Sequence, residues 1–287
     1  MKQLVCDLKK NFQINVHSSI NSGQVFLWKK VDAKWYGIDG DNILVLDRKS
    51  KFDKNDKLLF NFLRIDDDFE KILEQLRQDK IVNNAVTLYP GLKIFRQNPF
   101  QCYISFIVSS NSNISKIQLS LQNLCKKFGK QKLINGVSYF LFPKPNVLAE
   151  ASIHDIEKCG LGYRSKSVKN ASQCVINGEI DFEYLKKTDY HNAKKMLTKV
   201  SGIGNKVADC ILLFSLEKLE AFPLDRWMLR ILQKYYSKEF QIPTKTITEK
   251  TYENLHNDIV EYFGCYAGYA QQFLFKMERD LDKKTWL

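Results

Sequence analysis

The sequence lacks every cysteine pattern that would indicate a zinc site or a disulfide framework. Its seven cysteines are scattered over 287 residues and include no Cys-x-x-Cys pair, a spacing typical of zinc ligands and of redox motifs. An odd number of cysteines in a chain of this length also argues against a set of disulfides. We interpret them as buried thiols in a reducing compartment, and we predict no metal and no cofactor.

Long apolar runs are also missing. The longest aliphatic stretches, such as residues 211–216, fall far short of the roughly 20 residues that a membrane-spanning helix needs. Residues 1–7 contain a lysine but no apolar run, so they do not form a secretory signal. We therefore expect a soluble, intracellular protein with no membrane partner.

Acidic residues are fewer than basic ones. The chain has 44 Lys and Arg against 32 Asp and Glu, a formal net charge of +12, and a pI near 9.2. This excess favours a polyanionic partner, nucleic acid first and an anionic membrane surface second, but it identifies no reaction. The hydrophobic content of 44% and charged content of 26% are ordinary for a globular protein, and the length allows two domains.

Up to about residue 65 the apolar residues are spaced as in strands. Residues 12–16 alternate between apolar and polar, and the apolar stretches 35–38 and 43–46 flank an Asp-Gly-Asp-Asn turn at 39–42. Alternation that is broken by such turns predicts an antiparallel sheet with one covered face.

From Asp68 onward the spacing becomes helical and stays so to the C-terminus. The clearest examples are Phe69, Ile72, Leu73 and Leu76, and then Ile114, Ile117, Leu121 and Leu124. We therefore predict an α+β protein, with an N-terminal antiparallel β-sheet domain over residues 1–88 and a mostly helical domain over residues 89–287.

The segment 197–211 joins two apolar helical stretches through Gly202-Ile203-Gly204. Glycines permit positive φ and let a ligand approach the backbone closely. Amides at the N-terminus of the second helix form a seat for phosphate, so Gly202 and Gly204 are candidate DNA-binding residues. By itself, Gly-x-Gly favours an ordinary turn between two helices.

The residues around this turn form a longer pattern. Leu-x-x-Val-x-Gly-Ile-Gly-x-Lys-x-Ala-Asp places a lysine at 206 and ends at Asp209, and Asp225 follows sixteen residues later, after Pro223. The arrangement resembles the helix-hairpin-helix DNA glycosylase superfamily, which is marked by a hairpin, a Gly/Pro-rich loop and an Asp. A hairpin lysine at this place marks its bifunctional glycosylase/lyase members.

The chemistry of base excision needs these two residue types. Breaking an N-glycosidic bond develops positive charge on the sugar, which a carboxylate such as Asp225 stabilises. Lys206, as a neutral amine, can attack C1′ and hold the sugar as a Schiff base, and the first turn of a helix disfavours the ammonium form. Taken singly, Lys206 would be interpreted as a solvated surface lysine, and Asp225 as a helix N-cap.

Further segments resemble one family within the superfamily. Ser22-Gly23-Gln24-Val25-Phe26-Leu27-Trp28 is similar to the Ser-Gly-Gln-x-Phe-x-Trp segment of 8-oxoguanine DNA glycosylases. Other family blocks follow in the same order at residues 90–93, 105–114, 160–164 and 266–271. The resemblance spans residues 12–280. It implies excision of 8-oxoguanine from duplex DNA by base flipping, Schiff-base chemistry and β-elimination.

The resemblance also implies a base pocket. Gly23 would offer its carbonyl to the N7 hydrogen that 8-oxoguanine has and guanine lacks. Cys210 and Phe275 would sandwich the base, and Gln271 would read its Watson–Crick edge. Lys206 and Cys210 are four residues apart on one helix face, as are Gln271 and Phe275. Without the resemblance to the family, Cys210 and Phe275 would be interpreted as ordinary core residues, and Gly23 as a turn residue.

The remaining implied contacts are with the duplex. Asn111 and Arg164 would contact the orphaned cytosine, and Tyr163 would wedge into the stack; the alternative for Tyr163 and Arg164 is a surface loop. Eukaryotic members usually have Arg at the position of Lys116 and commonly His at that of Trp227. A lysine cannot make the planar bidentate contact of Arg, so we do not predict strict preference for cytosine opposite the lesion.

Two other functions stay open. One is a non-catalytic damage-sensing or DNA-binding module that reuses the hairpin, which the presence of Lys206 and Asp225 disfavours. The other is a monofunctional alkylbase glycosylase, a class that lacks the hairpin lysine.

Only Cys265 lies beyond residue 210, so no four-cysteine iron–sulfur cluster is expected. We expect a monomer that binds double-stranded DNA containing 8-oxoguanine, in the cytoplasm at the nucleoid, or in the nucleus of a eukaryote.

Overall fold

The structure is a computed structural model that describes residues 14–47, 56–134, 137–243 and 247–285. Its first part combines one small sheet with short helices. In chain order these elements are α1 (Val16–Ile20), β1 (Trp28–Val31), β2 (Lys34–Asp39), β3 (Asn42–Asp47), α2 (Lys57–Phe62), α3 (Phe69–Leu76) and α4 (Lys80–Leu88).

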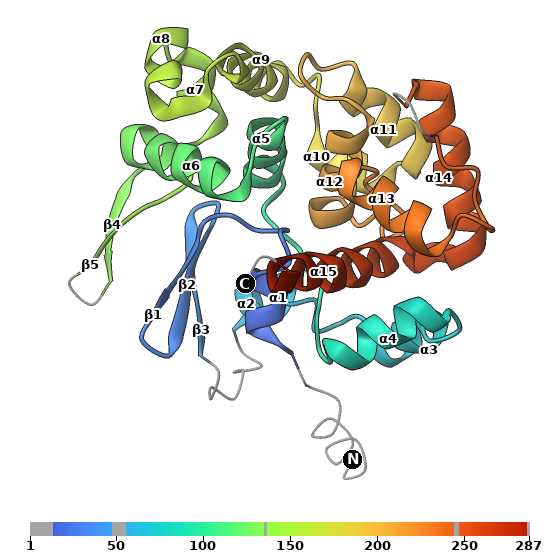
Figure 1. Cartoon of the computed structure of the whole chain (residues 1–287). Helices are drawn as coiled ribbons and strands as arrows, with labels where there is room; N and C mark the ends of the chain where they lie inside the picture. Colours follow the sequence, from blue (N-terminus) through green and yellow to red (C-terminus); the bar gives the residue numbers. More distant parts are fainter. Residues whose placement is uncertain (1–13, 48–55, 135–136, 244–246, 286–287) are drawn as a thin grey trace, which may run out of the picture.

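The rest of the described chain is mostly helical. Its elements are α5 (Pro99–Ser109), α6 (Ile114–Phe128), β4 (Gln131–Ile134), β5 (Val137–Phe140), α7 (Pro145–Glu150), α8 (Ile153–Ile156), the π-helical turn η2 (Glu157–Leu161), α9 (Arg164–Ile176), α10 (Phe182–Lys187), α11 (Tyr190–Thr198), α12 (Asn205–Ser215), α13 (Arg226–Tyr235), α14 (Glu249–Phe263), the 3₁₀ turn η3 (Gly264–Tyr266) and α15 (Ala267–Thr285). Figure 1 shows α5–α9 on one side, α10–α14 on the other, and α15 between these helices and the N-terminal elements.

The predicted antiparallel sheet is confirmed. Its strand order is β1-β2-β3, and Ile38 faces Ile43 across the β2–β3 pair, so the hairpin turns at the expected Asp-Gly-Asp-Asn segment. The helices predicted from residues 69 and 114 also form, as α3 and α6. A small antiparallel sheet followed by helices is the predicted α+β class. The boundary between residues 88 and 89 stays a prediction.

Two local predictions differ from the structure. A first strand was predicted over residues 12–16, of which Phe12 and Gln13 lie outside the described residues. The prediction is wrong at Val16, because this residue begins the helix α1. The side chain of Asn15 accepts a hydrogen bond from the backbone amide of Ser18 at 2.9 Å, and such a cap favours helix over strand. The antiparallel β4–β5 pair was not expected within the helical part.

The hydrophobic core has two parts. A smaller cluster fills the space under the sheet, where the ring of Phe62 stacks on Trp28 at 5.4 Å and on Phe95 at 4.6 Å between centroids. The larger cluster lies among the helices, and α12 runs through it with every residue from Val207 to Ser215 buried. Only the N-terminal end of α12, where the hairpin turns, reaches the surface.

The N-terminal elements are joined to the helical part by an ion cluster. The guanidinium of Arg64, which is fully buried, donates to the carboxylate of Glu217 at 2.7 Å, and Arg96 donates to the same carboxylate at 2.9 Å. Glu217 lies two residues after the last residue of α12. Buried charges are tolerated only when they are paired in this way. The cluster therefore fixes the far end of α12 to the N-terminal part of the chain.

The C-terminal helix makes a second connection. α15 packs against α4 and α13, and the side-chain amide of Gln272 donates to the carbonyl of Ser22 at 2.9 Å. No helix in the described ranges is long and apolar enough to cross a membrane.

We predict that Leu121→Ala lowers the free energy of unfolding by about 2–5 kcal/mol, because its side chain fills the core between helices and leaves a cavity when truncated. Urea unfolding followed by circular dichroism measures this. Leu119→Ala on the same helix is the control: Leu119 is 58% exposed, and its loss should cost less than about 0.5 kcal/mol. Equal losses would contradict the burial described for α6.

Candidate active site

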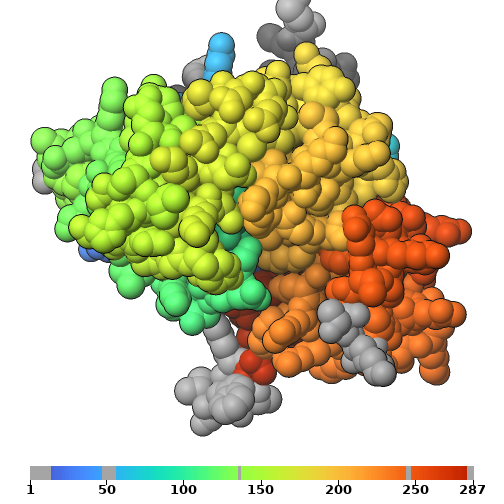
Figure 2. All heavy atoms as spheres, turned by 90° about the horizontal axis from the view of Figure 1, so that it is seen from above, coloured from blue at the N-terminus to red at the C-terminus, as the bar shows by residue number. Residues whose placement is uncertain are grey.

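A cleft of about 960 Å³ opens at the N-terminal end of α12. Four segments line it: residues 109–113 with Lys116, the hairpin residues 202 and 204–207, residues 224–227 with Leu229, and residues 247–249 with Tyr252. Seen from above, the surface is hollowed between the green segment that contains α6 and the orange segment that contains α13 (Figure 2). Segments far apart in the sequence therefore meet at one opening.

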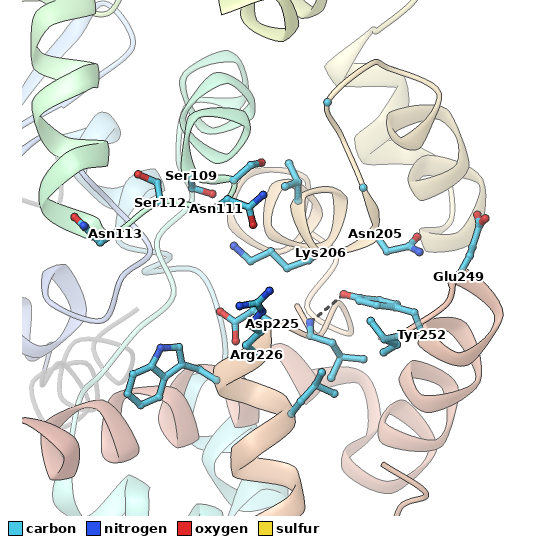
Figure 3. A pocket seen from close by; sticks show the side chains of 18 of the residues that line it. Ser109, Asn111, Ser112, Asn113, Asn205, Lys206, Asp225, Arg226, Glu249 and Tyr252 are labelled. Carbon is cyan, nitrogen blue, oxygen red and sulfur yellow. Dashed lines mark hydrogen bonds between the residues drawn. The ribbon is translucent and has the colours of Figure 1, made fainter. Parts of the chain in front are cut away.

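Lys206 is the second residue of α12, whose N-cap is Gly204. Its ammonium nitrogen lies 5.6 Å from the centroid of the Phe106 ring. The side chain is half-buried and extends into the cleft in the direction of Asp225 (Figure 3). The positive end of the helix dipole faces the amine, as the sequence predicted.

Asp225 lies at the start of α13, on the other side of this space. Its carboxylate accepts a hydrogen bond from the backbone amide of Met228 at 2.8 Å, which caps the helix. Figure 3 shows the carboxylate in the cleft beside Lys206. The capping role and a role in the cleft therefore coexist, because one bond to the backbone leaves acceptor capacity free.

The hairpin between α11 and α12 uses its two glycines differently. Gly202 has a φ of +92°, and a Cβ there would lie 2.4 Å from the Ser167 hydroxyl, so any side chain would force the hairpin away from α9. At Gly204 a Cβ would meet no atom within 4 Å. The backbone at Gly204 is therefore accessible to a large ligand at the mouth of the cleft.

Cys210 lies one helical turn after Lys206 and is buried. Burial raises the pKa of the Cys210 thiol to about 12, and the neighbouring charge of Lys206 opposes this only in part. The thiol is therefore neutral near pH 7. It offers a soft, polarisable surface, and of the two groups the amine is the better placed nucleophile.

The cleft lining does not include Gly23, Gln271 or Phe275. A Cβ on Gly23, which has a φ of +85°, would lie 3.2 Å from a carbon of the Phe275 ring, so these two residues are neighbours although 252 positions separate them. Gln271 is 7% exposed, and its side-chain carbonyl oxygen has no hydrogen-bond partner in the described part of the chain. A buried acceptor without a partner costs about 1–3 kcal/mol, which points to an absent donor.

The loop that carries Asn111 is held by Arg164. Asn111 has a left-handed backbone with a φ of +48° and lines the cleft. The buried guanidinium of Arg164 donates to the carbonyls of Ser110 at 2.7 Å, of Asn111 at 3.0 Å and of Leu161 at 3.3 Å. Arg164 therefore shapes this loop here, and its contact with an orphaned cytosine stays a prediction. Its neighbour Tyr163 is 65% exposed, as a wedge would be.

Comparison with known proteins identifies the family. Residues 104–257 match the HhH-GPD superfamily base excision DNA repair protein family, and residues 6–103 match the 8-oxoguanine DNA glycosylase N-terminal domain. The chain belongs to the HhH-GPD superfamily. The resemblance drawn from the motifs is thus confirmed.

Similar proteins of this superfamily come from several organisms. A probable N-glycosylase/DNA lyase of Methanothermobacter thermautotrophicus is 30% identical over 237 residues, 74% of this chain and 70% of the relative. N-glycosylase/DNA lyase OGG1 of Arabidopsis thaliana is 28% identical over 281 residues, 91% of this chain and 76% of the relative. The structure of Clostridium acetobutylicum 8-oxoguanine glycosylase/lyase, with double-stranded DNA containing cytosine opposite 8-oxoG, superposes with a TM-score of 0.85 at 28% identity, covering 94% of this chain and 93% of that one.

The two positions at which this HhH-GPD chain departs from the eukaryotic pattern both lie in the cleft lining. Lys116 and Trp227 line the cleft, and Trp227 is 36% exposed. Among the lining residues that the sequence analysis did not single out is Tyr252 of α14, whose hydroxyl accepts a hydrogen bond from the Leu224 amide at 2.9 Å. No motif surrounds it. Among the described residues, no group of three or more His, Cys, Asp and Glu side chains could hold a metal ion.

We predict that iodoacetamide at pH 8 modifies Cys265 well before Cys210. The raised pKa leaves Cys210 almost entirely as the unreactive thiol, and the side chain is buried, whereas Cys265 is exposed. Peptide mapping by mass spectrometry follows each site over time. The same reaction in denaturant is the control and should modify both. Equal rates in the folded protein would contradict the environment described for Cys210.

Proposed function

We propose that this protein is a bifunctional DNA glycosylase/AP lyase that excises 8-oxoguanine from duplex DNA. The observation that carries the proposal is the placement of Lys206 and Asp225 in one cleft at the mouth of the helix-hairpin-helix turn. The names of the similar proteins support the same activity.

Asp225 and Lys206 have different roles in the reaction. As the bond between C1′ and the base breaks, positive charge grows on the sugar, and the Asp225 carboxylate stabilises it electrostatically. The amine nitrogen of Lys206, in its unprotonated form, bonds to C1′ through its lone pair and then gives up a proton, while the base leaves with the electron pair of the bond to C1′ and takes up a proton. Opening of the sugar ring gives a Schiff base with Lys206. Loss of a C2′ proton then expels the 3′ phosphate, which is the lyase step.

Lesion selectivity is assigned to Gly23, Gln271 and the two residues that would sandwich the base. The Gly23 carbonyl is an acceptor for the N7 hydrogen of 8-oxoguanine, whereas N7 of guanine is itself an acceptor and would be repelled. The unpartnered oxygen of Gln271 supports a role in accepting a hydrogen bond from the base edge. Cys210 and Phe275 supply the two faces between which the flipped base lies.

Duplex DNA is held by the rim of the cleft. The hairpin backbone at Gly202 and Gly204 is assigned to a phosphate, with Asn111, Tyr163 and Arg164 at the gap left by the flipped base. Lys116 contributes charge without the geometry of Arg, so strict preference for cytosine opposite the lesion is not part of the proposal. The protein acts as a monomer on chromosomal DNA, at the nucleoid or, in a eukaryote, in the nucleus.

We predict that borohydride traps a covalent adduct between the wild-type protein and a duplex that contains 8-oxoguanine, because reduction fixes the Schiff base at Lys206. Lys206→Gln should give no adduct. Lys199→Gln is the matched control, since Lys199 is exposed at the other end of the same hairpin. Denaturing gel electrophoresis detects the adduct.

The outcome also separates the alternatives. If the wild type binds duplex DNA but forms no adduct and releases no base, the protein is a damage-sensing module. Release of methylpurines without any adduct indicates a monofunctional alkylbase glycosylase.

We predict that Gly23→Ala slows excision of 8-oxoguanine by about 10-fold or more, because the new methyl group must fit 3.2 Å from the Phe275 ring and the carbonyl shifts. Gly178→Ala is the control. Gly178 has a similar φ of +76°, but a Cβ there meets nothing within 4 Å. Both variants should lose about 1–3 kcal/mol of stability through backbone strain, measured by thermal unfolding. Equal excision rates for Gly23→Ala and Gly178→Ala would contradict the assignment of Gly23 to the base pocket.

A further inference from the structure

A buried carboxylate that the proposed chemistry does not use lies three residues after Lys206. Asp209 is fully buried, and its two oxygens accept hydrogen bonds from the Tyr190 and Tyr252 hydroxyls, each at 2.6 Å. The ammonium of Lys194 lies 3.1 Å from the same carboxylate. Removing a charge from water is costly unless it is paired and hydrogen-bonded, so a group with this many partners is held firmly in one place.

The Tyr252 hydroxyl makes one more contact, and this one leads to the cleft. It accepts a hydrogen bond from the backbone amide of Leu224 at 2.9 Å, which is the dashed line in Figure 3. Leu224 directly precedes Asp225. A single oxygen of α14 therefore connects Asp209 of α12 with the backbone that leads into Asp225.

We propose that Tyr252 is a positioning residue that sets Asp225 relative to Lys206. Lys206 and Asp209 lie on one helix, so the carboxylate of Asp209 is fixed with respect to the amine. Asp225 lies on another helix, and its own bond to Met228 orders it only within α13. The link through Tyr252 and Leu224 joins the two helices next to the reacting groups. The proposal rests on the proposed function.

The protonation of the phenol supports this arrangement. Burial, and then the charge of Asp209, raise the pKa of Tyr252 well above its usual value. The hydroxyl therefore keeps its proton, donates a hydrogen bond to the carboxylate, and accepts one from the Leu224 amide through a lone pair. Reacting groups must be held to within a fraction of an ångström for full activity, and α14 itself contributes no charged group that touches Asp225 in the described contacts.

Tyr252→Phe tests the proposal, and Tyr190→Phe is its matched control. Each variant removes one hydroxyl that donates at 2.6 Å to Asp209, but only Tyr252 contacts Leu224. Single-turnover release of 8-oxoguanine should slow about 10-fold in Tyr252→Phe and change less than about 2-fold in Tyr190→Phe. Binding of the lesion duplex should be unchanged in both, and both should melt at similarly lowered temperatures.

A second arm uses the background Asp225→Asn. If Tyr252 acts through Asp225, adding Tyr252→Phe to Asp225→Asn leaves the residual rate unchanged. A full 10-fold loss in that background, equal rates for Tyr252→Phe and Tyr190→Phe, or a Tyr252→Phe protein that does not fold would each overturn the proposal. If the wild type itself releases no base, the proposed function fails instead, and the two failures are thereby distinguished.

Discussion

The molecule depends on holding the amine of Lys206 beside the carboxylate of Asp225 at the open end of a buried helix. The remainder of α12 lies in the core, so the amine is carried by a helix that is packed along most of its length. The ion cluster at Glu217 fixes the far end of that helix, and the fit of Gly202 against Ser167 fixes the hairpin at the near end. Binding energy from a large DNA ligand is then available for base extrusion rather than for ordering the site.

The sequence predicted those parts of the fold in which burial leaves a periodic pattern. β2 and β3 have one face against the core, so their residues alternate, and α3 and α6 each carry an apolar stripe. The β4–β5 hairpin has no buried face, and Leu133 is 67% exposed, so no alternation reveals it. At Val16 the strand prediction failed because the cap at Asn15 is a local polar interaction that hydrophobic periodicity does not contain.

The candidate site was likewise predictable from the sequence only in part. Lys206, Asp225 and the hairpin glycines lie within one continuous pattern, and the structure brings them to one cleft. Tyr252 could not be found, because its contact with Leu224 joins residues 28 positions apart with no shared spacing. Arg164 was expected at the DNA surface, and the structure adds that its guanidinium donates to three backbone carbonyls, which no motif indicates. A sequence shows that a side chain can donate hydrogen bonds, but only the folded chain shows which acceptors lie in reach.

The central claim is that one particular amine bonds to deoxyribose, and it is tested most directly by locating the modified residue. Digestion of the reduced protein–DNA adduct, followed by tandem mass spectrometry, should place the sugar remnant on Lys206 alone. A remnant on the cleft residue Lys116 or on buried Lys194 would contradict the account, because the nucleophile would then not be the amine at the helix end on which this site is built.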